Sequence, residues 1–498
     1  MWTSLVNKMQ SATALLALVC LGCLLAQADQ FKLLHDFNNA DGLEPTFMVQ
    51  KPDGSLYGVT ILGGANQFDG VLYKIDRAGT FSVVHHFSDA PDGAIPGRLI
   101  LGSDGNIYGL TGSGGAILES GTVYQVDSAD NYSVLHSFNS QVDGAGPVFL
   151  MEASDGFFYG TTATSGNPNP ACPNHKAQGT FFRMDSTGNV TPLHTFCETT
   201  DGSIPNGVVE VSPGQFYGTC LEDGPLQAET GNGTLWKSDA SGNVDLVRVF
   251  GTHTVINSEP NEPLGLVLAS DGLLYGVSNG GGAFSNGAIY RSDLNGNVTT
   301  LHSFNDLGTS GADPDANFTL GHDGFFYGTA STGGLPVGNP SRSGVVYRAD
   351  TAGNVWVLHS YRGSDGAAPN AIPLLGRPNN TVYATAVIGG SQQSGTVGSL
   401  SLSQNLPVRA LTFSPNPVKG GQSTTATLTL SAPAPAGGQV VKLFASNSAS
   451  VPSSVTVPAG QTKVTFSIRT LKVSANLDVF ITANINSEGL TSRLTLTP

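Results

Sequence analysis

Short apolar stretches alternate with glycine-rich turns along most of the chain. The stretches are rich in Val, Thr, Tyr and Phe, and alternate apolar positions predict strands with one buried face. One tripeptide recurs every 51 to 58 residues, and its seven copies are Leu56-Tyr57-Gly58, Ile107-Tyr108-Gly109, Phe158-Tyr159-Gly160, Phe216-Tyr217-Gly218, Leu274-Tyr275-Gly276, Phe326-Tyr327-Gly328 and Val382-Tyr383-Ala384. Recurrence at this spacing indicates a repeated supersecondary unit.

Each copy contains the same parts in the same order. An apolar stretch precedes an Asp-Gly turn such as Asp53-Gly54, and the Tyr-Gly strand follows the turn. A Gly pair usually ends that strand. A third strand then starts at a Gly, as in Gly179-Thr180-Phe181-Phe182, and ends in an Asp-x-x-Gly turn, as in Asp185-Ser186-Thr187-Gly188. The last strand carries Leu-His-x-Phe, as in residues 135–138. These turns favour tight hairpins, so each copy predicts four short antiparallel strands.

The two ends of the array predict a closed ring. Leu-His-x-Phe already occurs at residues 34–37, before any Tyr-Gly strand, whereas the seventh copy lacks it after Gly395. Residues 30–37 are therefore expected to supply the fourth strand of the last unit. Rings of four-stranded units are typical of β-propellers, which leave only short sheet edges open. The prediction for residues 29–400 is an all-β, seven-bladed β-propeller with four-stranded blades.

The chain after the array follows a different pattern. Residues 401–407 contain Pro and Ser and are predicted to be a linker. Residues 408–498 contain about seven alternating strands separated by Gly, Pro and Asn turns, which predicts an Ig-like β-sandwich. We expect this unit to act as a spacer, stalk or surface-association module.

The first 28 residues have the pattern of a signal peptide. Lys8 precedes an apolar run from Ala12 to Ala26, and a small-x-small cleavage pattern ends at Ala28. The run is too short to favour spanning a bilayer, so no membrane span is predicted. Cys23 leaves a lipoprotein alternative open, although Cys20 stands where a lipobox usually has Leu.

The order of the motifs resembles a known repeat. Asp-Gly-x-x-Pro, Asp-Gly-x-Leu-Tyr-Gly, Gly-Gly, Gly-Thr-Val-Tyr and Leu-His-Ser-Phe recur over about residues 30–400, as in the Gloeobacter/Verrucomicrobium tandem repeat of exported bacterial proteins. The resemblance implies a propeller and provides no catalytic residues to transfer. The Gly pair and the third-strand Tyr also resemble kelch propellers, whose Trp is missing here. Three turns depart from the consensus, at Pro213-Gly214, Asn257-Ser258 and Asn379-Asn380.

Charge narrows the range of partners. Residues 29–405 hold 14 basic and 35 acidic residues, a net charge of −21, whereas residues 406–498 hold seven basic and two acidic residues. A surface this acidic repels nucleic acids and acidic polysaccharides, and solubility alone also explains it. We expect a monomer that is secreted, extracellular or at the cell surface, with the periplasm as an alternative.

The repeated ionisable residues are predicted to be structural. The histidines of Leu-His-x-Phe lie on outer strands that splay apart, so they cannot converge on one ion (His35, His85, His136, His194, His302 and His359). The Asp-Gly-x-x-Pro carboxylates should ring the channel mouth, where they are an alternative site for Ca²⁺ or a neutral sugar (Asp41, Asp92, Asp143, Asp201 and Asp365). Recurrence in nearly every copy favours closure of their own turns instead. No other cofactor or metal is predicted.

Loops that break the repeat are better binding candidates, because binding groups on rigid scaffolds tend to lie on loops. They are residues 167–178, 221–231 and 335–343, and their candidate side chains are His175, Glu222, Asp223, Glu229 and Arg342. A Cys172–Cys197 disulfide is predicted, with Cys197–Cys220 as the rival pairing.

Enzyme signatures such as His-Glu-x-x-His and Gly-x-Ser-x-Gly are missing, so no catalytic residues are predicted. The first hypothesis is an exported, non-catalytic binding or cell-surface protein whose propeller presents a face to a glycan or protein ligand. The alternatives are an extracellular enzyme acting on a polysaccharide or small metabolite, and a structural or adhesive repeat protein.

Overall fold

The computed structural model describes residues 31–498 except 118–119, 165–171, 173–176, 226–232, 252–258, 306–309, 335–342, 378–379, 403–407, 447 and 486–487. The predicted signal peptide and most of the predicted linker lie outside these residues. All regular elements in the described part are β-strands, and no helix occurs there. The chain is therefore all-β, as the sequence predicts.

Four-stranded antiparallel sheets make up the first part of the chain, and each is built from strands that are neighbours in sequence. The first three sheets are β2 (Leu43–Gln50), β3 (Leu56–Leu62), β4 (Val71–Ile75) and β5 (Phe81–His86); β6 (Ala94–Leu101), β7 (Ile107–Ser113), β8 (Thr122–Val126) and β9 (Tyr132–Ser137); β10 (Ala145–Glu152), β11 (Phe158–Thr164), β12 (Ala177–Met184) and β13 (Val190–Cys197).

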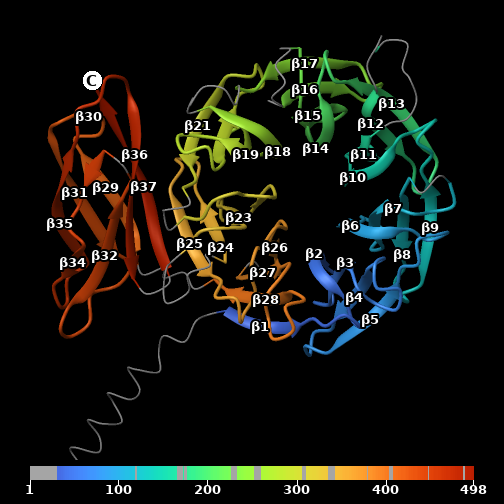
Figure 1. The fold of residues 1–498 in the computed structure, drawn as a ribbon, viewed down its shortest axis with the longest axis horizontal. Coiled ribbons are helices and arrows are strands. Elements are labelled where there is room, and N and C mark those ends of the chain that lie inside the picture. Colours follow the sequence, from blue (N-terminus) through green and yellow to red (C-terminus); the bar gives the residue numbers. More distant parts are fainter. Residues whose placement is uncertain are drawn as a thin grey trace, which may run out of the picture.

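The next three groups continue the pattern. They are β14 (Ser203–Ser212), β15 (Gln215–Glu222), β16 (Thr234–Asp239) and β17 (Val244–Val249); β18 (Pro260–Leu268), β19 (Leu274–Gly281), β20 (Ala288–Ser292) and β21 (Val298–Ser303); β22 (Thr319–Leu320), β23 (Phe326–Ala330), β24 (Val345–Ala349) and β25 (Val355–Ser360). Figure 1 shows the sheets side by side in a ring, with the first strand of each nearest the centre and the fourth at the rim.

The ring is closed by strands from opposite ends of the array. The last sheet has the order β26 (Leu374–Leu375), β27 (Thr381–Ala386), β28 (Thr396–Ser401) and β1 (Phe31–Asp36). β1 pairs antiparallel with β28 from Phe31 opposite Leu400 to Asp36 opposite Thr396. The N-terminal strand thus takes the fourth position of the last sheet, which the surplus Leu-His-x-Phe motif predicts.

The glycine of the Tyr-Gly motif leaves room for an aromatic ring from the next strand. A Cβ atom added to Gly276 would lie 2.5 Å from the Tyr290 side chain, and one added to Gly328 would lie 2.5 Å from that of Tyr347. Both rings are fully buried. In the last sheet, Ala384 replaces the glycine and pairs with Gly398 of the next strand. This paired exchange explains why the seventh copy of the motif tolerates alanine.

The C-terminal strands form two sheets packed on each other. The strands are β29 (Val408–Ser414), β30 (Val418–Lys419), β31 (Ser423–Leu430), β32 (Gln439–Ala445), β33 (Ala449–Ser450), β34 (Ser454–Val457), β35 (Lys463–Thr470), β36 (Leu477–Ile485) and β37 (Glu488–Thr497). One sheet has the order β29-β31-β35-β33, and the other contains β34, β32, β36 and β37, with β30 beside β37. Strand β31 has alternate buried residues, the pattern of a sheet with one covered face.

The C-terminal unit is joined to the ring by a shared sheet. β37 pairs antiparallel with β25, from Val355 opposite Thr491 to Val357 opposite Gly489. The result is a nine-stranded sheet that runs from the ring into the C-terminal unit (Figure 1). All six residues of β25 are buried, whereas the outer strand β5 of the first sheet has none buried. The repeat pattern of the sequence does not predict this contact.

Candidate binding face

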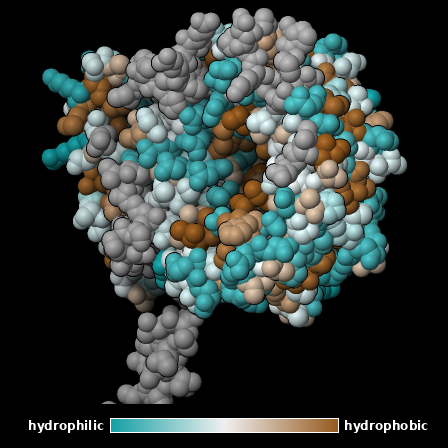
Figure 2. All heavy atoms as spheres, turned by 45° about the vertical axis from the view of Figure 1, so that its right-hand side comes forward, coloured by the Kyte–Doolittle hydropathy of each residue, from teal (hydrophilic) through white to brown (hydrophobic). Residues whose placement is uncertain are grey.

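The strand order gives the ring two faces with different chemistry. The loops after the second strand of each sheet, such as 63–70, and the connections after the fourth, such as 87–93, lie on one face, here called the loop face. The Asp-Gly and Asp-x-x-Gly turns lie on the opposite face, here called the turn face. Figure 2 shows a hollow at the ring centre, with both apolar and hydrophilic residues reaching the surface around it.

On the loop face, the repeated histidines meet the repeated aspartates. The Nε2 atom of each histidine lies near the Oδ2 atom of the aspartate in the next connection. The pairs are His35–Asp41 at 3.2 Å, His85–Asp92 at 2.7 Å, His136–Asp143 at 2.8 Å, His194–Asp201 at 2.6 Å and His359–Asp365 at 3.1 Å. Each pair fastens an outer strand to the connection that leaves it.

The second carboxylate oxygen of each of these aspartates also accepts a hydrogen bond. The amides of Asn38, Asn139, Cys197 and Arg362 donate to Oδ1 of Asp41, Asp143, Asp201 and Asp365, respectively, and the Ser88 hydroxyl donates to Asp92. These bonds close the turns that contain the aspartates. Burial raises the pKa of Asp365, but bonds from His359 and the Arg362 amide hold it below its ordinary value.

In two sheets, other residues stand in place of the His–Asp pair. At the fourth sheet, Arg248 stands in place of the histidine and lies 3.3 Å from Glu259. At the fifth, His302 Nε2 lies 3.2 Å from the Ser310 hydroxyl. Burial, helped by the positive charge of Arg493, lowers the pKa of His302 to about 3, so its ring is neutral at physiological pH. Among the described residues, no group of three or more His, Cys, Asp or Glu side chains is arranged to hold a metal ion.

Two predicted binding residues lie on the loop face beside the fourth sheet. Glu222 ends β15, and Asp223 follows it with a positive φ of 61°. The Ser203 hydroxyl donates to the Asp223 carboxylate. Burial raises the pKa of Glu222, and the negative charges of Asp223 and Glu262 raise it further. Negative charges from two neighbouring sheets therefore act on Glu222 at this point of the loop face.

Sequence reasoning missed Glu262. Glu262 directly precedes Pro263 in the connection before β18. Glu44 and Ile95 occupy the same position before a proline in the first two connections, and all three residues have a positive φ. An alignment of the connections would have placed an acid here beside the irregular loop of the fourth sheet. The remaining candidates, His175, Glu229 and Arg342, lie outside the described residues.

The cysteines fix one loop to the ring. Cys172 and Cys197 form a disulfide, which ties the loop before β12 to the end of β13. Cys220 is a buried free thiol, so the rival Cys197–Cys220 pairing is wrong. Burial raises the pKa of the Cys220 thiol well above its ordinary value, which keeps it protonated and unreactive.

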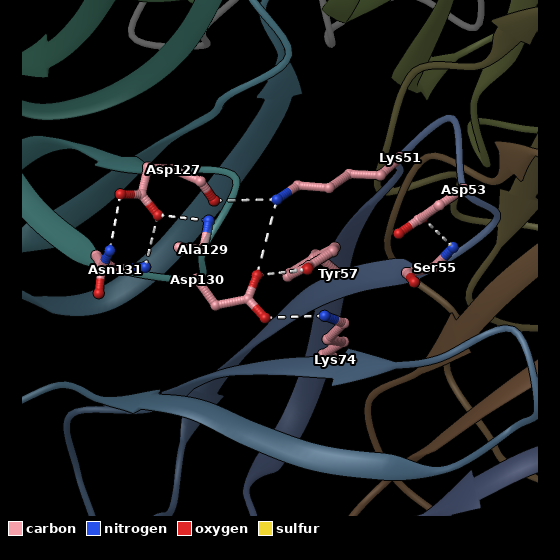
Figure 3. Close-up of polar contacts among 9 residues, drawn as sticks. All are labelled: Lys51, Asp53, Ser55, Tyr57, Lys74, Asp127, Ala129, Asp130 and Asn131. Atoms are coloured by element: carbon pink, nitrogen blue, oxygen red, sulfur yellow. Dashed lines mark hydrogen bonds and ion pairs between the residues drawn. The ribbon is translucent and has the colours of Figure 1, made fainter.

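A second polar cluster lies on the turn face between the first two sheets (Figure 3). The Tyr57 hydroxyl donates to Asp130 Oδ1 at 2.5 Å, and Lys74 Nζ lies 2.8 Å from Asp130 Oδ2. Lys51 Nζ donates to the Asp127 carbonyl at 3.1 Å and lies 3.7 Å from Asp130. In the other sheets with this bond, the tyrosine donates to the aspartate of its own turn, as Tyr108 does to Asp104.

This cluster has the character of a cross-link between sheets. Burial and the hydrogen bond to Asp130 raise the pKa of Tyr57 to about 12, so its hydroxyl stays protonated at neutral pH and cannot act as a base. Burial raises the pKa of Asp130, but its bonds from Lys74 and Tyr57 outweigh this and lower it overall. The sequence signal was available, because Asp130 occupies the turn position that is Gly79 in the first repeat and Gly188 in the third.

Of three solved structures that are similar to this chain, the first, with a TM-score of 0.52, supports the fold. The extracellular domain of BT3049 from B. thetaiotaomicron, described as a hybrid two-component system, matches with 11% identity over 95% of this chain and 58% of that chain, at a TM-score of 0.52. The extracellular domain of BT4673 from the same organism matches with 10% identity over 95% and 58%, at 0.47. The gluconolactonase XC5397 from Xanthomonas campestris matches with 12% identity over 75% and 89%, at 0.38.

At such low sequence identity, the similarity shows the fold alone. This chain spans little more than half the length of the two extracellular domains. No curated protein matches the sequence. Among the described residues, no helix is long and apolar enough to cross a membrane. The Gloeobacter/Verrucomicrobia repeat matches residues 24–230 and 212–434, which together cover most of the chain. The chain therefore belongs to the Gloeobacter/Verrucomicrobia repeat family.

Proposed function

We propose that the ring is a seven-bladed β-propeller of residues 29–400, closed by its own N-terminal strand. In this proposal residues 1–28 are a signal peptide, 401–407 a linker and 408–498 an Ig-like sandwich. The groups of four strands around the ring and the pairing of β1 with β28 support the propeller. The two packed sheets of the C-terminal unit support the sandwich.

We further propose that the protein is exported and binds a ligand without catalysis. The signal-peptide pattern and the disulfide favour an oxidising compartment outside the cytoplasm. The extracellular domain with the same fold agrees with this location. The protein would then act at the cell surface, in the surrounding matrix or in the periplasm.

One observation carries the proposed ligand face. The repeated ionisable groups of the loop face bond to one another, whereas Glu222, Asp223 and Glu262 gather where the fourth and fifth sheets depart from the repeat. The Cys172–Cys197 disulfide, at the end of β13, lies on the same face. Carboxylates in this arrangement accept hydrogen bonds from sugar hydroxyls or from the cationic side chains of a protein. The ligand is therefore a neutral glycan or a basic protein segment.

The test is an array of glycans and Lys- or Arg-rich peptides, probed with the chain that begins at Asp29, with and without calcium. The double variant Glu222→Gln/Glu262→Gln should bind the best probe at least tenfold more weakly. Asp245→Asn is the matched control, because this side chain is exposed on the outer strand of the same sheet. Equal loss in the control, or no binding to any probe in either condition, would overturn the proposal.

A further inference from the structure

A cleft of about 1000 Å³ lies between the sixth sheet of the ring and the C-terminal unit. Its ring wall contains Phe325, Arg348 and Trp356, and its other wall comes from β29 and β37, with Arg409 and Arg493 among the lining residues. A volume of this size is at the upper end for small-molecule sites, which often form where two units meet. The cleft is separate from the loop face, because its ring wall includes the Asp350 turn on the turn face.

Three arginines give the cleft a positive character in a chain whose formal net charge is −15. Arg348 lies over two aromatic faces, with its guanidinium carbon 4.3 Å from the ring centre of Phe325 and 5.2 Å from that of Trp356. Arg409 is exposed and makes no hydrogen bond or ion pair with a described residue. The cleft therefore offers two planar guanidinium groups as hydrogen-bond donors. That of Arg409 has no partner among the described residues, and that of Arg348 lies flat against the Phe325 and Trp356 rings.

The carboxylates near the cleft have partners other than Arg409. Asp350 lines the cleft, but its oxygens accept the amides of Ala352 and Asn354 and the Asn354 side chain at 2.8 to 3.0 Å. Asp478 lies 3.4 Å from Arg493, which also donates to the Thr300 carbonyl of the ring. Arg409 has neither kind of partner. A ligand that brings its own oxyanion therefore fits the cleft best.

We propose that this cleft is a second binding site, for a segment of an oligosaccharide that carries carboxylate groups. The carboxylates pair with Arg409 and the exposed edge of Arg348, and the sugar rings pack against Phe325 and Phe413 of the lining. Thr412 supplies an exposed hydroxyl for the sugar hydroxyls. The basic C-terminal unit attracts such a ligand locally, whereas the acidic ring repels it elsewhere. This site does not depend on the proposed ligand face.

The test is a titration of the chain that begins at Asp29 with hexagalacturonic acid, at about 0.1 M salt to screen distant charges. Intrinsic fluorescence reports on Trp356, because Trp2 precedes this chain and Trp236 is buried in the fourth sheet. We expect saturable binding, which calorimetry also detects. Arg409→Ala should weaken binding roughly tenfold through loss of a charge-assisted pair.

Arg469→Ala is the matched control, because Arg469 is exposed on β35 in the same sheet as Arg409 but does not line the cleft. It should bind as the native chain does, and so should Glu222→Gln/Glu262→Gln. Maltohexaose, a neutral oligosaccharide of the same length, should not bind. Equal weakening by Arg409→Ala and Arg469→Ala, or no saturable binding, would overturn the site. A full response to inorganic phosphate or sulfate alone would overturn its saccharide specificity.

Discussion

At the scale of single residues, each repeat depends on a glycine that faces an aromatic ring. The ring fills the space that a side chain would need, as Tyr290 does above Gly276. The fully buried hydroxyl of Tyr290 has no hydrogen-bond partner among the described residues, and burial raises its pKa. In the third sheet the same position is Phe182, which has no hydroxyl at all. The aromatic ring at this position matters to the fold, and its hydroxyl group does not.

Two tyrosines of the fifth sheet test this distinction. Tyr290→Phe removes an unpaired buried hydroxyl, so the free energy of unfolding should stay the same or rise by about 1 kcal/mol. Tyr275→Phe instead removes a hydroxyl that donates to Asp271 at 2.8 Å, and should cost about 1 kcal/mol. Urea unfolding of both variants measures the difference. A larger loss for Tyr290→Phe than for Tyr275→Phe would contradict the assignment.

His302 makes stability depend on pH. Its native pKa of about 3 is below the value of 6.5 for the unfolded chain, so the unfolded state takes up a proton first as the pH falls. Stability from this residue is complete above pH 6.5 and decreases as the pH falls toward 3. At pH 5 the loss is about 2 kcal/mol, since one pKa unit corresponds to about 1.4 kcal/mol.

The variant His302→Phe keeps an aromatic ring and removes the titrating group. Its unfolding free energy should therefore change less between pH 7 and pH 5 than that of the native chain. His322→Gln is the control, because His322 is exposed. Chemical unfolding at the two pH values provides the measurement, and identical pH dependence in native and His302→Phe chains would refute this role.

At the scale of elements, the repeat made the strands and their order predictable, because turn residues and periodic apolar positions act locally. The closing strand was also predictable, because Leu-His-x-Phe at residues 34–37 had no partner in its own copy. The junction between β25 and β37 was not, because neither strand carries a motif whose counterpart is missing from the array. One residue did mark it: Trp356 occupies the outer-strand position that is Ser82 in the first repeat and Ser133 in the second.

The candidate site was only partly predictable. Glu222 and Asp223 were found because they break the repeat, but their proximity to Glu262 depends on how two sheets are placed in the ring. The cross-link at Asp130 was missed for the same reason, since Lys74 and Tyr57 belong to the neighbouring sheet. Local patterns identify unusual residues, and packing between sheets decides which of them meet.

Deletion of residues 29–38 tests the closing strand. The remaining chain would expose the edge of β28 and lose the stack of Phe31 on His359, whose ring centres lie 4.1 Å apart. We expect a clear fall in Tm, which calorimetry measures. Adding a synthetic peptide of residues 29–38 should restore part of the loss, whereas a scrambled peptide should not. An unchanged Tm after the deletion would contradict closure by this strand.

At the scale of the whole molecule, the C-terminal unit and the sixth sheet share one core. Trp356 and Leu358 of the ring belong to the same buried cluster as Leu411 and Leu490 of the C-terminal unit. His302 and Phe480 add an edge contact between rings, with centres 5.0 Å apart. The unit is therefore held in a fixed position, and a flexible stalk would not bury these residues.

The variant Trp356→Ser restores the small polar residue of other outer strands and tests this docking. It removes a large buried side chain, so the junction should lose about 3 to 5 kcal/mol. We expect faster proteolysis between residues 401 and 408 and a separate thermal transition for the C-terminal unit. Trp236→Phe, inside the fourth sheet, is the control and should leave cleavage at the junction unchanged. Cleavage at the native rate in Trp356→Ser would argue against docking.

The pairing of β1 with β28 also sets an order of events during synthesis. The strand made first pairs with one made near the end of the array, so the ring cannot close until Thr396 has left the ribosome. In the sheets between them, strands that are neighbours in sequence pair with each other and need no such delay, apart from the added pairing of β25 with β37. Contacts between distant parts of a chain form slowly, so closure should be the late step of folding. Until then, β1 is an unpaired strand that a chaperone, or a second nascent copy, has time to capture.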